Sequence, residues 1–493
     1  MNKKPNVLIF LTDDQGYGDL SKSGNKNLST PIIDNLEKDG AKMMNFYTCP
    51  LCAPSRAELL TGRQFIKTGV YGVTRKAEYI NLDETTIGDV FQENGYRTAC
   101  FGKWHSGSLY PYHPNGRGFE EFYGFCCGHW GYYFNTTMDH NGKEVRGKNY
   151  IIDDVTNHAI DYIDQNSDKP FLCYVAYNTP HSPYQVPEKF YEKFRDFPLI
   201  SRAEEPEKEN IDITRAVMAM CENIDWNMGR VLEKIKEKGI EEDTIILYLS
   251  DNGPTGSVRY NSGLKGLKGG INEGSVKTAC SITWKNHIPK GMTVNQLSST
   301  MDILPTMAGL CQIHAKTNHA LDGIDLTAYL TENKKEITDR NIFALQTDNG
   351  SVKLSVRNQR YRYIHGQNEL YDINNDSGEQ NNILDQNKEI GEELKKICDQ
   401  FKQENVPDKF DTRYLTIGYP QHPKSYLNAQ DGEPQGKITW SSIHPNCSYF
   451  MNWDNEADVM KWPVMVKESG KYQVTVMYTC EECSPGNILT VQS

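Results

Sequence analysis

Two apolar stretches of the sequence, residues 7–11 and 245–249, are each followed, one residue further on, by a pair of oxygen-bearing side chains. The four residues are Asp13, Asp14, Asp251 and Asn252. Carboxylate and amide oxygens, without thiolates or imidazoles, favour Ca²⁺ or Mg²⁺ over Zn²⁺, and a set of many protein ligands favours Ca²⁺. A single Asp after a strand is more often a helix cap or a turn former. Two pairs at equivalent places nevertheless predict a calcium site.

Two further apolar stretches, residues 98–101 and 171–176, lead to cationic or proton-transferring side chains. Lys103 and His105 follow the first in TACFGKWH, and His181 follows the second in FLCYVAYNTPH. The carboxyl ends of parallel strands meet at one edge of an open sheet, where ligands bind. A lone histidine is more often structural than catalytic, so the prediction of a site rests on this shared location.

Cys52 is the third feature, in the run LCAPSRAELLTGR. Pro54 and Ser55 suit the start of a helix, which places Cys52 at a helix N-terminus, where backbone amides and the helix dipole stabilise an anion. The residues alone leave two readings open. Cys52 is either a nucleophilic thiolate of low pKa or a buried structural cysteine, and a thiolate is a poor match for a hard Ca²⁺ ion.

The elements that must position these residues alternate between strands and helices over the first three hundred residues. The predicted helices cover residues 85–94, 153–166 and 213–238, and Gly95 and Gly239 follow the first and last of them, where a left-handed residue ends a helix. This order predicts an α/β fold with a mostly parallel central sheet sandwiched by helices.

The rest of the chain is expected to form a small C-terminal antiparallel α+β subdomain and a terminal β-rich module. We predict a catalytic α/β domain over residues 1–340, the small antiparallel-sheet subdomain over 341–412, and a linker plus the β-rich module over 413–493. The subdomain should end in a helix at 388–404. The linker should cover 416–434, and residues 462–466 and 471–478 should form a hairpin of a partial β-sandwich.

The composition excludes some functions. The chain has 493 residues, with 65 acids against 53 bases and a net charge of −12, which disfavours binding to nucleic acid or to an anionic membrane surface. No apolar run approaches the roughly 18 residues that span a bilayer, so we expect no membrane span. The thirteen cysteines do not suggest a small disulfide scaffold. The pair Cys480 and Cys483 is expected to be a disulfide or plain thiols, because a zinc site needs a second ligand pair.

The run CAPSR followed by AELLTGR resembles the C-x-P-S-R…TGR signature of the formylglycine-dependent sulfatases, an arylsulfatase-like family in the alkaline-phosphatase-like superfamily. The likeness continues through NVLIFLTDDQGYGDL, GYRTACFGKWH, LYLSDNG and LKGLKGG, and covers roughly residues 5–405. It implies a sulfuric ester hydrolase in which a formylglycine-generating maturation enzyme oxidises Cys52 to an aldehyde. The aldehyde hydrate is an oxygen nucleophile, which suits calcium.

The resemblance also implies residue roles. Modified Cys52 joins the four oxygen-bearing residues as a calcium ligand, and Arg56 and Lys103 hold the hydrate and the sulfate oxygens. His105 takes the proton that lets sulfate leave, and His181 or Lys268, the latter in GLKGG, is the acid for the leaving alcohol. One hydrate oxygen attacks sulfur, the alcohol departs, and the sulfated enzyme intermediate collapses to aldehyde and sulfate.

The segment HPNGRGFEEFYGFCCGHWGYYFN, residues 113–135, is rich in aromatic and basic side chains and falls between strands. Aromatic faces with a few polar groups suit a sugar ring, so we expect a sulfated carbohydrate substrate, with Arg117, His129 and Trp130 as substrate-binding candidates. The alternative, equally weighted for Trp130 and Tyr132, is that these aromatics cover the core. A polysaccharide substrate implies a periplasmic or secreted enzyme, although the sequence contains no signal peptide.

Two rival functions are considered. The first is a phosphonate or phosphodiester hydrolase of the same superfamily, which comparison of matched aryl sulfate and phosphodiester substrates would distinguish. The second is a carbohydrate-binding protein with a decayed catalytic domain. The runs GKWH and TPH favour the sulfatase over the first rival, and the presence of every expected catalytic residue disfavours the second.

Overall fold

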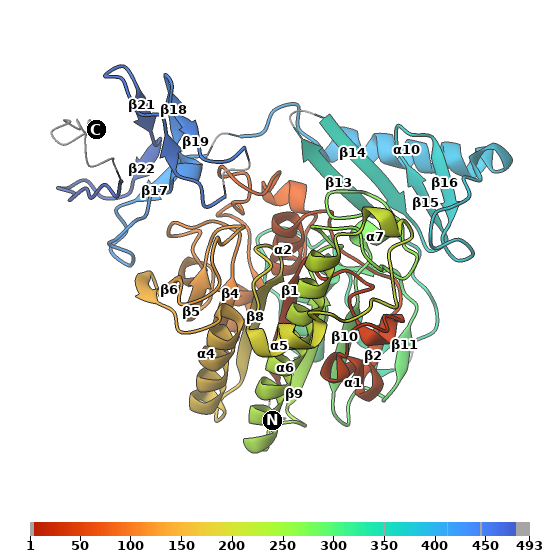
Figure 1. Cartoon of the computed structure of the whole chain (residues 1–493). Coiled ribbons are helices and arrows are strands. Elements are labelled where there is room, and N and C mark those ends of the chain that lie inside the picture. The colour runs from red at the N-terminus through yellow and green to blue at the C-terminus, as the bar shows by residue number, and fades with distance from the viewer. Residues whose placement is uncertain (1–3, 333, 349–350, 412, 444–445, 480–493) are drawn as a thin grey trace.

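The computed structural model describes residues 4–332, 334–348, 351–411, 413–443 and 446–479. A ten-stranded sheet forms its centre (Figure 1). In spatial order the strands are β11 (Met292–Val294), β2 (Ala41–Met43), β10 (Cys280–Trp284), β9 (Thr244–Ser250), β1 (Asn6–Asp13), β8 (Phe171–Pro180), β4 (Arg97–Lys103), β5 (Glu121–Phe125), β6 (Thr137–His140) and β7 (Lys143–Arg146).

The middle of the sheet is parallel. Strands β9, β1, β8, β4 and β5 pair in parallel in that order, and all four predicted strands are among them. Thr12 of β1 is in register with Ser250 of β9, so the two predicted acid-bearing strand ends are neighbours. β10, β6 and β7 add antiparallel pairs toward the edges. The predicted parallel α/β sheet is therefore confirmed.

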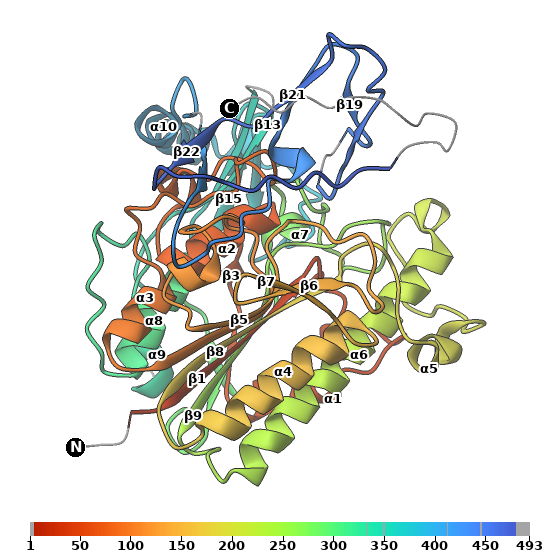
Figure 2. The same ribbon diagram turned by 90° about the vertical axis from the view of Figure 1, so that its left-hand side faces the viewer.

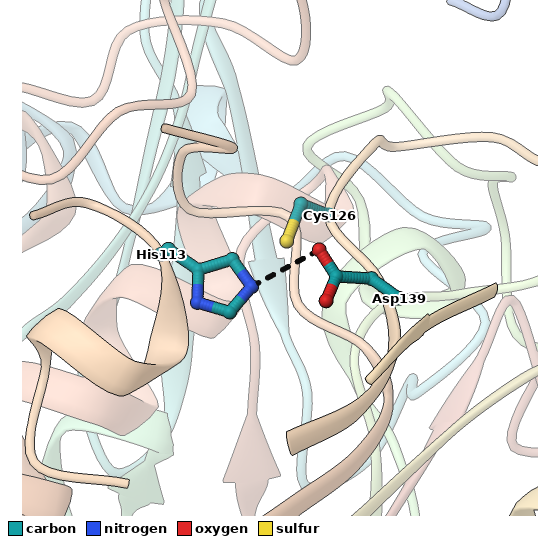
Figure 3. Close-up of side chains that lie close together, drawn as sticks. All are labelled: His113, Cys126 and Asp139. Carbon is teal, nitrogen blue, oxygen red and sulfur yellow. Dashed lines mark hydrogen bonds and ion pairs between the residues drawn. The ribbon is translucent and has the colours of Figure 1, made fainter. Parts of the chain in front are cut away.

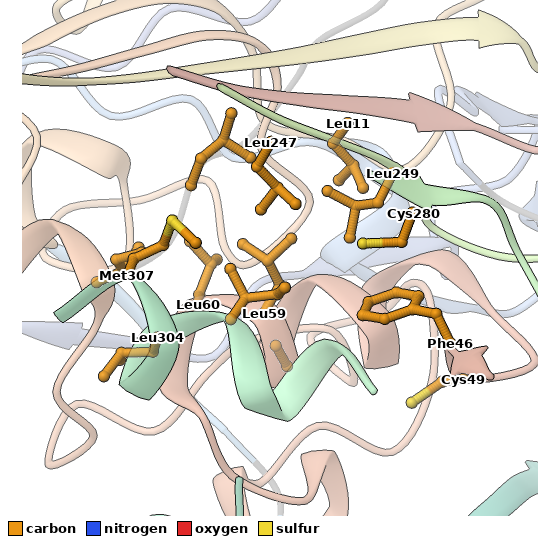
Figure 4. Packing of buried hydrophobic residues seen from close by; sticks show 14 of the residues in the cluster. Leu11, Phe46, Cys49, Leu59, Leu60, Leu247, Leu249, Cys280, Leu304 and Met307 are labelled. Atoms are coloured by element: carbon orange, nitrogen blue, oxygen red, sulfur yellow. The ribbon is translucent and has the colours of Figure 1, made fainter. Parts of the chain in front are cut away.

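Both faces of the sheet are covered. Val7, Ile9 and Leu11 of β1 face one core, while Leu8 and Phe10 face the other. On the first face the sheet packs against α2 (Cys52–Thr61) and α8 (Ile303–Leu310), as Figure 4 shows. On the second face α1 (Pro31–Asp39), α4 (Ile151–Asn166) and α6 (Ile211–Glu237) lie side by side (Figure 2). A strand buried on both faces needs apolar residues at every position, which is how these runs stand out in the sequence.

The helix ends follow their local chemistry. α3 (Ile87–Glu93) begins with a capping box in which Thr86 and Asp89 exchange side-chain and backbone hydrogen bonds. Gly95 and Gly239 have positive φ angles of 81° and 67° beyond α3 and α6. The three predicted helices are confirmed to within two residues at each end.

The predicted antiparallel subdomain is also present. Its sheet runs in the order β13 (Ile342–Asp348), β14 (Ser351–Arg357), β15 (Tyr361–Ile364) and β16 (Glu369–Asp372), and α10 (Lys388–Asn405) packs on it. One layer of this packing is the stacked pair Phe343 and Phe401, whose ring centroids are 3.9 Å apart.

The terminal module, defined as residues 413–479, differs from the prediction. It consists of three two-stranded sheets, β17 (Leu415–Ile417) with β22 (Val464–Val466), β18 (Glu433–Gln435) with β21 (Val459–Lys461), and β19 (Thr439–Trp440) with β20 (Phe450–Met451). The predicted hairpin is wrong, because β22 pairs in parallel with β17 and residues 467–479 contain no strand.

The predicted linker over 416–434 is likewise not a plain spacer. It contains most of β17 and part of β18, and the adjoining Leu415 is fully buried against Tyr79, Leu109 and Tyr112. The domain boundaries stay predictions. Cys480 and Cys483 lie outside the described residues.

The remaining elements are short. They are β3 (Phe46–Tyr47), β12 (Ser298–Ser299), α5 (Glu188–Tyr191), α7 (Glu273–Val276) and α9 (Thr327–Thr331). Among the described residues, no helix combines the length and the apolarity needed to cross a membrane.

Candidate active site

The acid pairs meet at the carboxyl ends of β1 and β9. The Asp14 backbone N–H donates to Asp251 Oδ1 at 3.1 Å, and the Asn252 side-chain amide donates to Asp14 Oδ1 at 2.7 Å. Asp14 adopts a positive φ of 65°, an uncommon conformation for a residue other than glycine. Such strain is found where a site holds a residue in place. The structure therefore brings all four predicted calcium ligands together.

Three cations neutralise three carboxylates here. Lys103 Nζ lies 2.6 Å from Asp13 Oδ2, and Lys268 Nζ lies 2.6 Å from Asp14 Oδ1. Arg56 binds Asp251 Oδ2 through Nε at 3.2 Å and a terminal nitrogen at 2.9 Å. Lys103 and Arg56 are fully buried, so these pairs lie in a region of low dielectric where each charge acts strongly on its neighbours.

The pKa values show how unevenly this charge is balanced. Burial alone would raise the pKa of Asp13, but Lys103, His181 and Arg56 hold it well below its usual range. Burial and the neighbouring Asp13 raise the pKa of Asp251, even with Arg56 beside it. The charge of Asp13 thus opposes ionisation of Asp251 in spite of Arg56, and a cation bound between the two carboxylates would relieve that repulsion.

Several oxygens of this group are buried without a hydrogen-bond partner among the described residues. They are Asp13 Oδ1, Asp14 Oδ2, Asn252 Oδ1 and Thr12 Oγ1. Buried polar atoms nearly always have partners, so this concentration of unbonded oxygens at one strand edge fits a role as metal ligands. Cys52 Sγ and carboxylate oxygens of Asp13 and Asp251 lie within 4.8 Å of one another. The donor set, mostly hard oxygen, fits Ca²⁺.

Cys52 is the first residue of α2 and is only 3 % exposed. Ser55 holds the approach to the helix, since its Oγ accepts from the Cys49 N–H at 2.9 Å and donates to Leu51 O at 3.1 Å. No side chain caps the helix at Leu51. The predicted position at a helix N-terminus is confirmed, and Arg56 stands one turn further along.

His105 presents one ring nitrogen to the site. Its Nε2–H donates a hydrogen bond to Val73 O at 2.8 Å, so Nδ1 carries the lone pair. That Nδ1 is buried with no hydrogen-bond partner in the described part of the chain. Burial and then Lys103 lower the pKa of His105 well below its usual range. A Cβ at Gly128 would lie 2.2 Å from His105 Nε2, so the ring requires a glycine there.

His181 is oriented in a similar way. Its Nδ1 lies 2.8 Å from Ser182 O, which leaves Nε2 facing Asp14 Oδ2 at 3.6 Å. Burial lowers the pKa of His181. The ring of His129 is 5.4 Å from that of His181, and burial with the neighbouring His181 lowers the pKa of His129 to about 4. Of the substrate-binding candidates, His129 alone is brought to this group.

The other two substrate-binding candidates have structural roles. Arg117 is only 4% exposed. Its guanidinium donates to the backbone oxygens of Asn81, Leu82 and Glu84 and so stabilises that loop. Trp130 stacks on Phe125 with ring centroids 5.1 Å apart and donates to Thr136 Oγ1 at 2.8 Å. These contacts give both side chains a structural role, and their contact with a substrate stays a prediction.

A second cluster with metal-ligand chemistry lies apart from the motifs. It contains His113, Cys126 and Asp139 (Figure 3). His113 Nδ1 accepts from the Asn115 N–H at 3.2 Å, so its Nε2 carries the proton and donates to Asp139 Oδ2 at 3.2 Å. Asp139 Oδ1 accepts from the Gly142 N–H at 2.7 Å. With these atoms bonded to one another, the cluster is explained as a structural link rather than a zinc site.

The sequence motifs missed two supporting residues. Arg259 pairs with Asp19 at 2.6 Å and donates to the Asp14 backbone oxygen at 3.3 Å, which supports the strained Asp14. Gln346 of β13, in the small subdomain, lies close to Gly269, the residue that follows Lys268. A Cβ added to Gly269 would lie 3.5 Å from Gln346 Nε2. Its Oε1 is buried without a partner among the described residues. Neither residue lies in a recognisable run, so only the tertiary structure could reveal them.

Comparison with known proteins agrees with this geometry. The sulfatase family model matches residues 5–313, and a model described as N-sulphoglucosamine sulphohydrolase, C-terminal, matches residues 268–404. An uncharacterized sulfatase, YdeN, of Escherichia coli (strain K12) is 29% identical over 395 residues, covering 69% of this chain and 68% of that protein. N-acetylgalactosamine-6-sulfatase of Canis lupus familiaris is 28% identical over 380 residues, covering 70% of this chain and 69% of that protein.

Solved structures give the same result. A crystal structure of Ps i-CgsB in complex with k-i-k-neocarrahexaose superposes with a TM-score of 0.75 at 28% identity, covering 83% of this chain and 95% of that one. A phosphonate monoester hydrolase of Agrobacterium radiobacter shares the fold, with a TM-score of 0.62 at 18% identity over 82% of this chain and 96% of that one. The family model covers more than half of the chain and includes every motif at the strand edge, so the chain belongs to the sulfatase family and is a sulfuric ester hydrolase.

Proposed function

We propose that this sulfatase removes sulfate from a sulfated mono-, oligo- or polysaccharide, and that it does so with a formylglycine made from Cys52 and a Ca²⁺ ion. The observation that carries the proposal is the position of Cys52. It begins α2 within 4.8 Å of carboxylate oxygens from Asp13 and Asp251, and two buried cations, Arg56 and Lys103, reach the same carboxylates.

The ion would be held by Asp13, Asp14, Asp251, Asn252 and the modified Cys52. Support comes from the unpartnered oxygens and from the raised pKa of Asp251, which both indicate room for one more positive charge. When bound, Ca²⁺ supplies a fixed positive charge beside the reacting sulfate group. A sulfur ligand on this hard ion would be a mismatch, which favours the oxygen-bearing form of residue 52.

Formylglycine supplies an oxygen nucleophile, and its formation requires the maturation enzyme as a partner. Two cationic side chains, Arg56 and Lys103, would then stabilise the negative charge of the sulfate group. Arg56 and Lys103 are fully buried and fixed by Asp251 and Asp13, so they can hold sulfate oxygens without reorganising as charge develops.

Two histidines would move protons. His105 has a lone pair on Nδ1, fixed by the Val73 carbonyl, and can accept the proton whose loss releases sulfate. His181 Nε2 faces the site and can, when protonated, donate to the leaving oxygen. Lys268 is held by Asp14, which with its other carboxylate neighbours keeps its pKa above the usual range in spite of burial. Its role is therefore to hold charge beside the leaving oxygen, and His181 is the better acid.

A carbohydrate substrate is supported by the names of the relatives, since N-acetylgalactosamine-6-sulfatase acts on a sugar and Ps i-CgsB was solved with a neocarrahexaose. His129 beside His181 offers a polar group for a sugar hydroxyl. A role in polysaccharide degradation, with the enzyme periplasmic or secreted, follows from such a substrate.

The test compares matched substrates. Protein co-expressed with a maturation enzyme is assayed with nitrophenyl sulfate, with bis-nitrophenyl phosphate, and for sulfate release from a panel of sulfated saccharides. We expect turnover of a sulfated saccharide with higher kcat/KM than of either nitrophenyl ester. Faster cleavage of the phosphodiester would overturn the sulfate-ester assignment, and activity restricted to nitrophenyl sulfate would overturn the carbohydrate assignment.

A further inference from the structure

A hollow of about 460 Å³ lies between three segments that are distant in the sequence. They are the loop between β5 and β6, residues 184–191, which include α5, and the first turns of α6; α5 packs against α6 (Figure 2). Six lining side chains are apolar or aromatic: Phe134, Tyr184, Val186, Tyr191, Ile213 and Ala216. Small-molecule sites occupy roughly 300–1,000 Å³, so the hollow has the size and the lining of a ligand site.

The aromatic walls of the hollow are held in place from behind. Phe134 packs against the core on the second face of the sheet, Tyr191 against a smaller core cluster beside α6, and Tyr184 against both. All three side chains are half-buried, so part of each ring stays accessible. Rings anchored in this way form a pre-formed apolar surface, which suits the CH-rich face of a sugar ring.

Tyr133 ties this wall to the candidate active site. Its hydroxyl donates to Ser182 O at 2.8 Å and lies 3.0 Å from His181 O. Its backbone N–H donates to the side-chain oxygen of Gln185, another lining residue, at 2.8 Å. The segment that carries His181 and the segment that lines the hollow are therefore fixed by the same residue.

Tyr184 connects the hollow with the proposed calcium site. A Cβ added at Gly256, four residues beyond Asn252, would overlap the Tyr184 hydroxyl, so the two segments are in close contact. Tyr184 is also three residues beyond His181, and three residues span at most about 11 Å. A saccharide whose leaving oxygen lies at His181 therefore has the hollow within reach of its next ring.

The polar lining of the hollow is acidic. Glu188 and Asp212 are lining residues, and the described residues that line the hollow include no lysine, arginine or histidine. Glu188 pairs with Arg195, and Asp212 Oδ1 lies 3.8 Å from a terminal nitrogen of Arg215. A sulfate group in the hollow would thus meet carboxylates and no lining cation, which disfavours a charged ring.

We propose that this hollow binds an unsulfated sugar ring next to the ring that carries the reacting sulfate. The inference rests on the proposed carbohydrate substrate and adds the part of it that lies beyond the ester. Removing roughly 60 Å² of apolar surface from water corresponds to about tenfold in affinity, so the neutral ring should raise kcat/KM by about that factor. A second sulfate on that ring should cancel the gain, because the lining is acidic.

Steady-state kinetics on matched substrates provides the primary test. The sulfated monosaccharide with the highest kcat/KM in the panel is compared with disaccharides that add one neutral ring on either side, and with the same disaccharides sulfated on the added ring. We expect one neutral disaccharide to be the best substrate. If no added ring raises kcat/KM, or if the doubly sulfated disaccharide is best, the subsite is wrong and the proposed function stands. If no saccharide is turned over, both are wrong.

Two aromatic variants locate the effect. Tyr191→Ala removes one wall of the hollow and should abolish the preference for the neutral disaccharide over the monosaccharide. Tyr449→Ala is the matched control, because Tyr449 belongs to the terminal module, is 65% exposed and does not line the hollow. Retention of the preference in Tyr191→Ala, or its loss in Tyr449→Ala, would contradict the proposal.

A third variant tests the charge of the lining by a gain rather than a loss. Asp212 has a side chain that is 86% exposed, so Asp212→Lys should fold normally. It places a cation in the lining and should raise kcat/KM on the doubly sulfated disaccharide relative to the neutral one. An unchanged ratio would show that the second ring lies elsewhere.

Discussion

The two histidines of the candidate site are each fixed by a backbone carbonyl, and the proposed mechanism uses the other ring nitrogen of each for proton transfer. His105 is held by Val73 O and His181 by Ser182 O, both at 2.8 Å. In both neutral rings the remaining nitrogen carries the lone pair, so in the proposed mechanism His105 accepts a proton directly, whereas His181 must be protonated on Nε2 before it donates one. The histidine positions could be predicted from the strand ends. Their tautomers could not, because the carbonyl that orients His105 comes from a loop about thirty residues away.

His181 should matter most for substrates that leave as a basic alkoxide. A sugar alkoxide needs a proton as it departs, while nitrophenolate does not, so loss of a general acid is felt mainly by the sugar ester. We expect His181→Ala to reduce kcat/KM on a sulfated saccharide by about 10²–10⁴-fold and on nitrophenyl sulfate by far less. Steady-state kinetics on both substrates measures this, and an equal loss on both would rule out the acid role.

Asp251 should be required for the metal. Asp251→Asn removes a carboxylate oxygen from the proposed set of calcium ligands, so we expect isothermal calorimetry to show loss of Ca²⁺ binding. Asp139→Asn is the matched control, because the cluster of Figure 3 is satisfied without an ion. Calcium binding that survives in Asp251→Asn and disappears in Asp139→Asn would show that the two clusters have been assigned the wrong way round.

At the scale of elements, α2 carries Cys52, the proposed source of the nucleophile, at its first turn and the buried acid Glu58 at its second. Glu58 accepts from Thr300 Oγ1 at 2.7 Å, and burial raises its pKa to about 7 from 4.5. Between these two values the folded protein retains a proton that the unfolded chain releases. The free energy of unfolding contributed by Glu58 is therefore highest below pH 4.5, falls as the pH rises toward 7, and is constant above it.

Glu58→Gln should remove this pH dependence. A neutral amide has no proton to release. The variant should therefore lack the fall in the free energy of unfolding between pH 4.5 and about 7, which amounts to up to about 3 kcal/mol. Urea unfolding at a series of pH values measures the difference from wild type. Glu93→Gln, at an exposed position ending α3, is the control and should leave the slope unchanged. A Glu58→Gln slope equal to wild type would show that Glu58 is ionised in the folded protein.

The elements also show where sequence patterns fail. The four parallel strands could be predicted because the middle of each is a mostly apolar run whose residues are nearly all buried. The hairpin predicted over residues 462–466 and 471–478 does not form. Alternate residues of its second half are apolar or aromatic, as in a strand, but they cover no core: their exposed fractions are 46% for Tyr472, 63% for Val474, 41% for Val476 and 71% for Tyr478. Alternation indicates a strand only where a partner surface exists.

At the scale of the whole molecule, the terminal module is joined to the catalytic part through Leu415. That side chain is fully buried in a cluster with Tyr79, Leu109 and Tyr112. Leu415→Ala should destabilise the docked module by about 2–5 kcal/mol, the range for truncating a buried leucine to alanine. Limited proteolysis should then cleave within 413–443 faster than in wild type.

Leu427→Ala is the matched control for that prediction. Leu427 is 37% exposed, so its truncation should leave the cleavage rate close to that of wild type. If Leu415→Ala and Leu427→Ala are cleaved at the same rate, the cluster around Tyr79 does not hold the module.

The overall architecture could be predicted only in part. The order of strands and helices indicates the central sheet, and the change of pattern near residue 341 indicates the small sheet. The docking of residues 413–479 on the active-site rim gives no periodic signal, because its strands are two or three residues long and form only against distant partners. The contact of Cys447 with the His129 backbone oxygen follows from that docking. Gln346 lies in β13 instead, and its approach to Gly269 depends on how the small sheet packs on the catalytic part.

The most direct test of the whole account is the chemical state of Cys52. Protein made with graded amounts of maturation enzyme is analysed by mass spectrometry of the Cys52 peptide and, in parallel, for sulfate release. The account predicts that turnover rises in proportion to the aldehyde fraction, that protein with an intact thiol binds substrate without turning it over, and that Cys52→Ala is folded but inactive. Full turnover by protein whose Cys52 remains a thiol, or by Cys52→Ala, would contradict it.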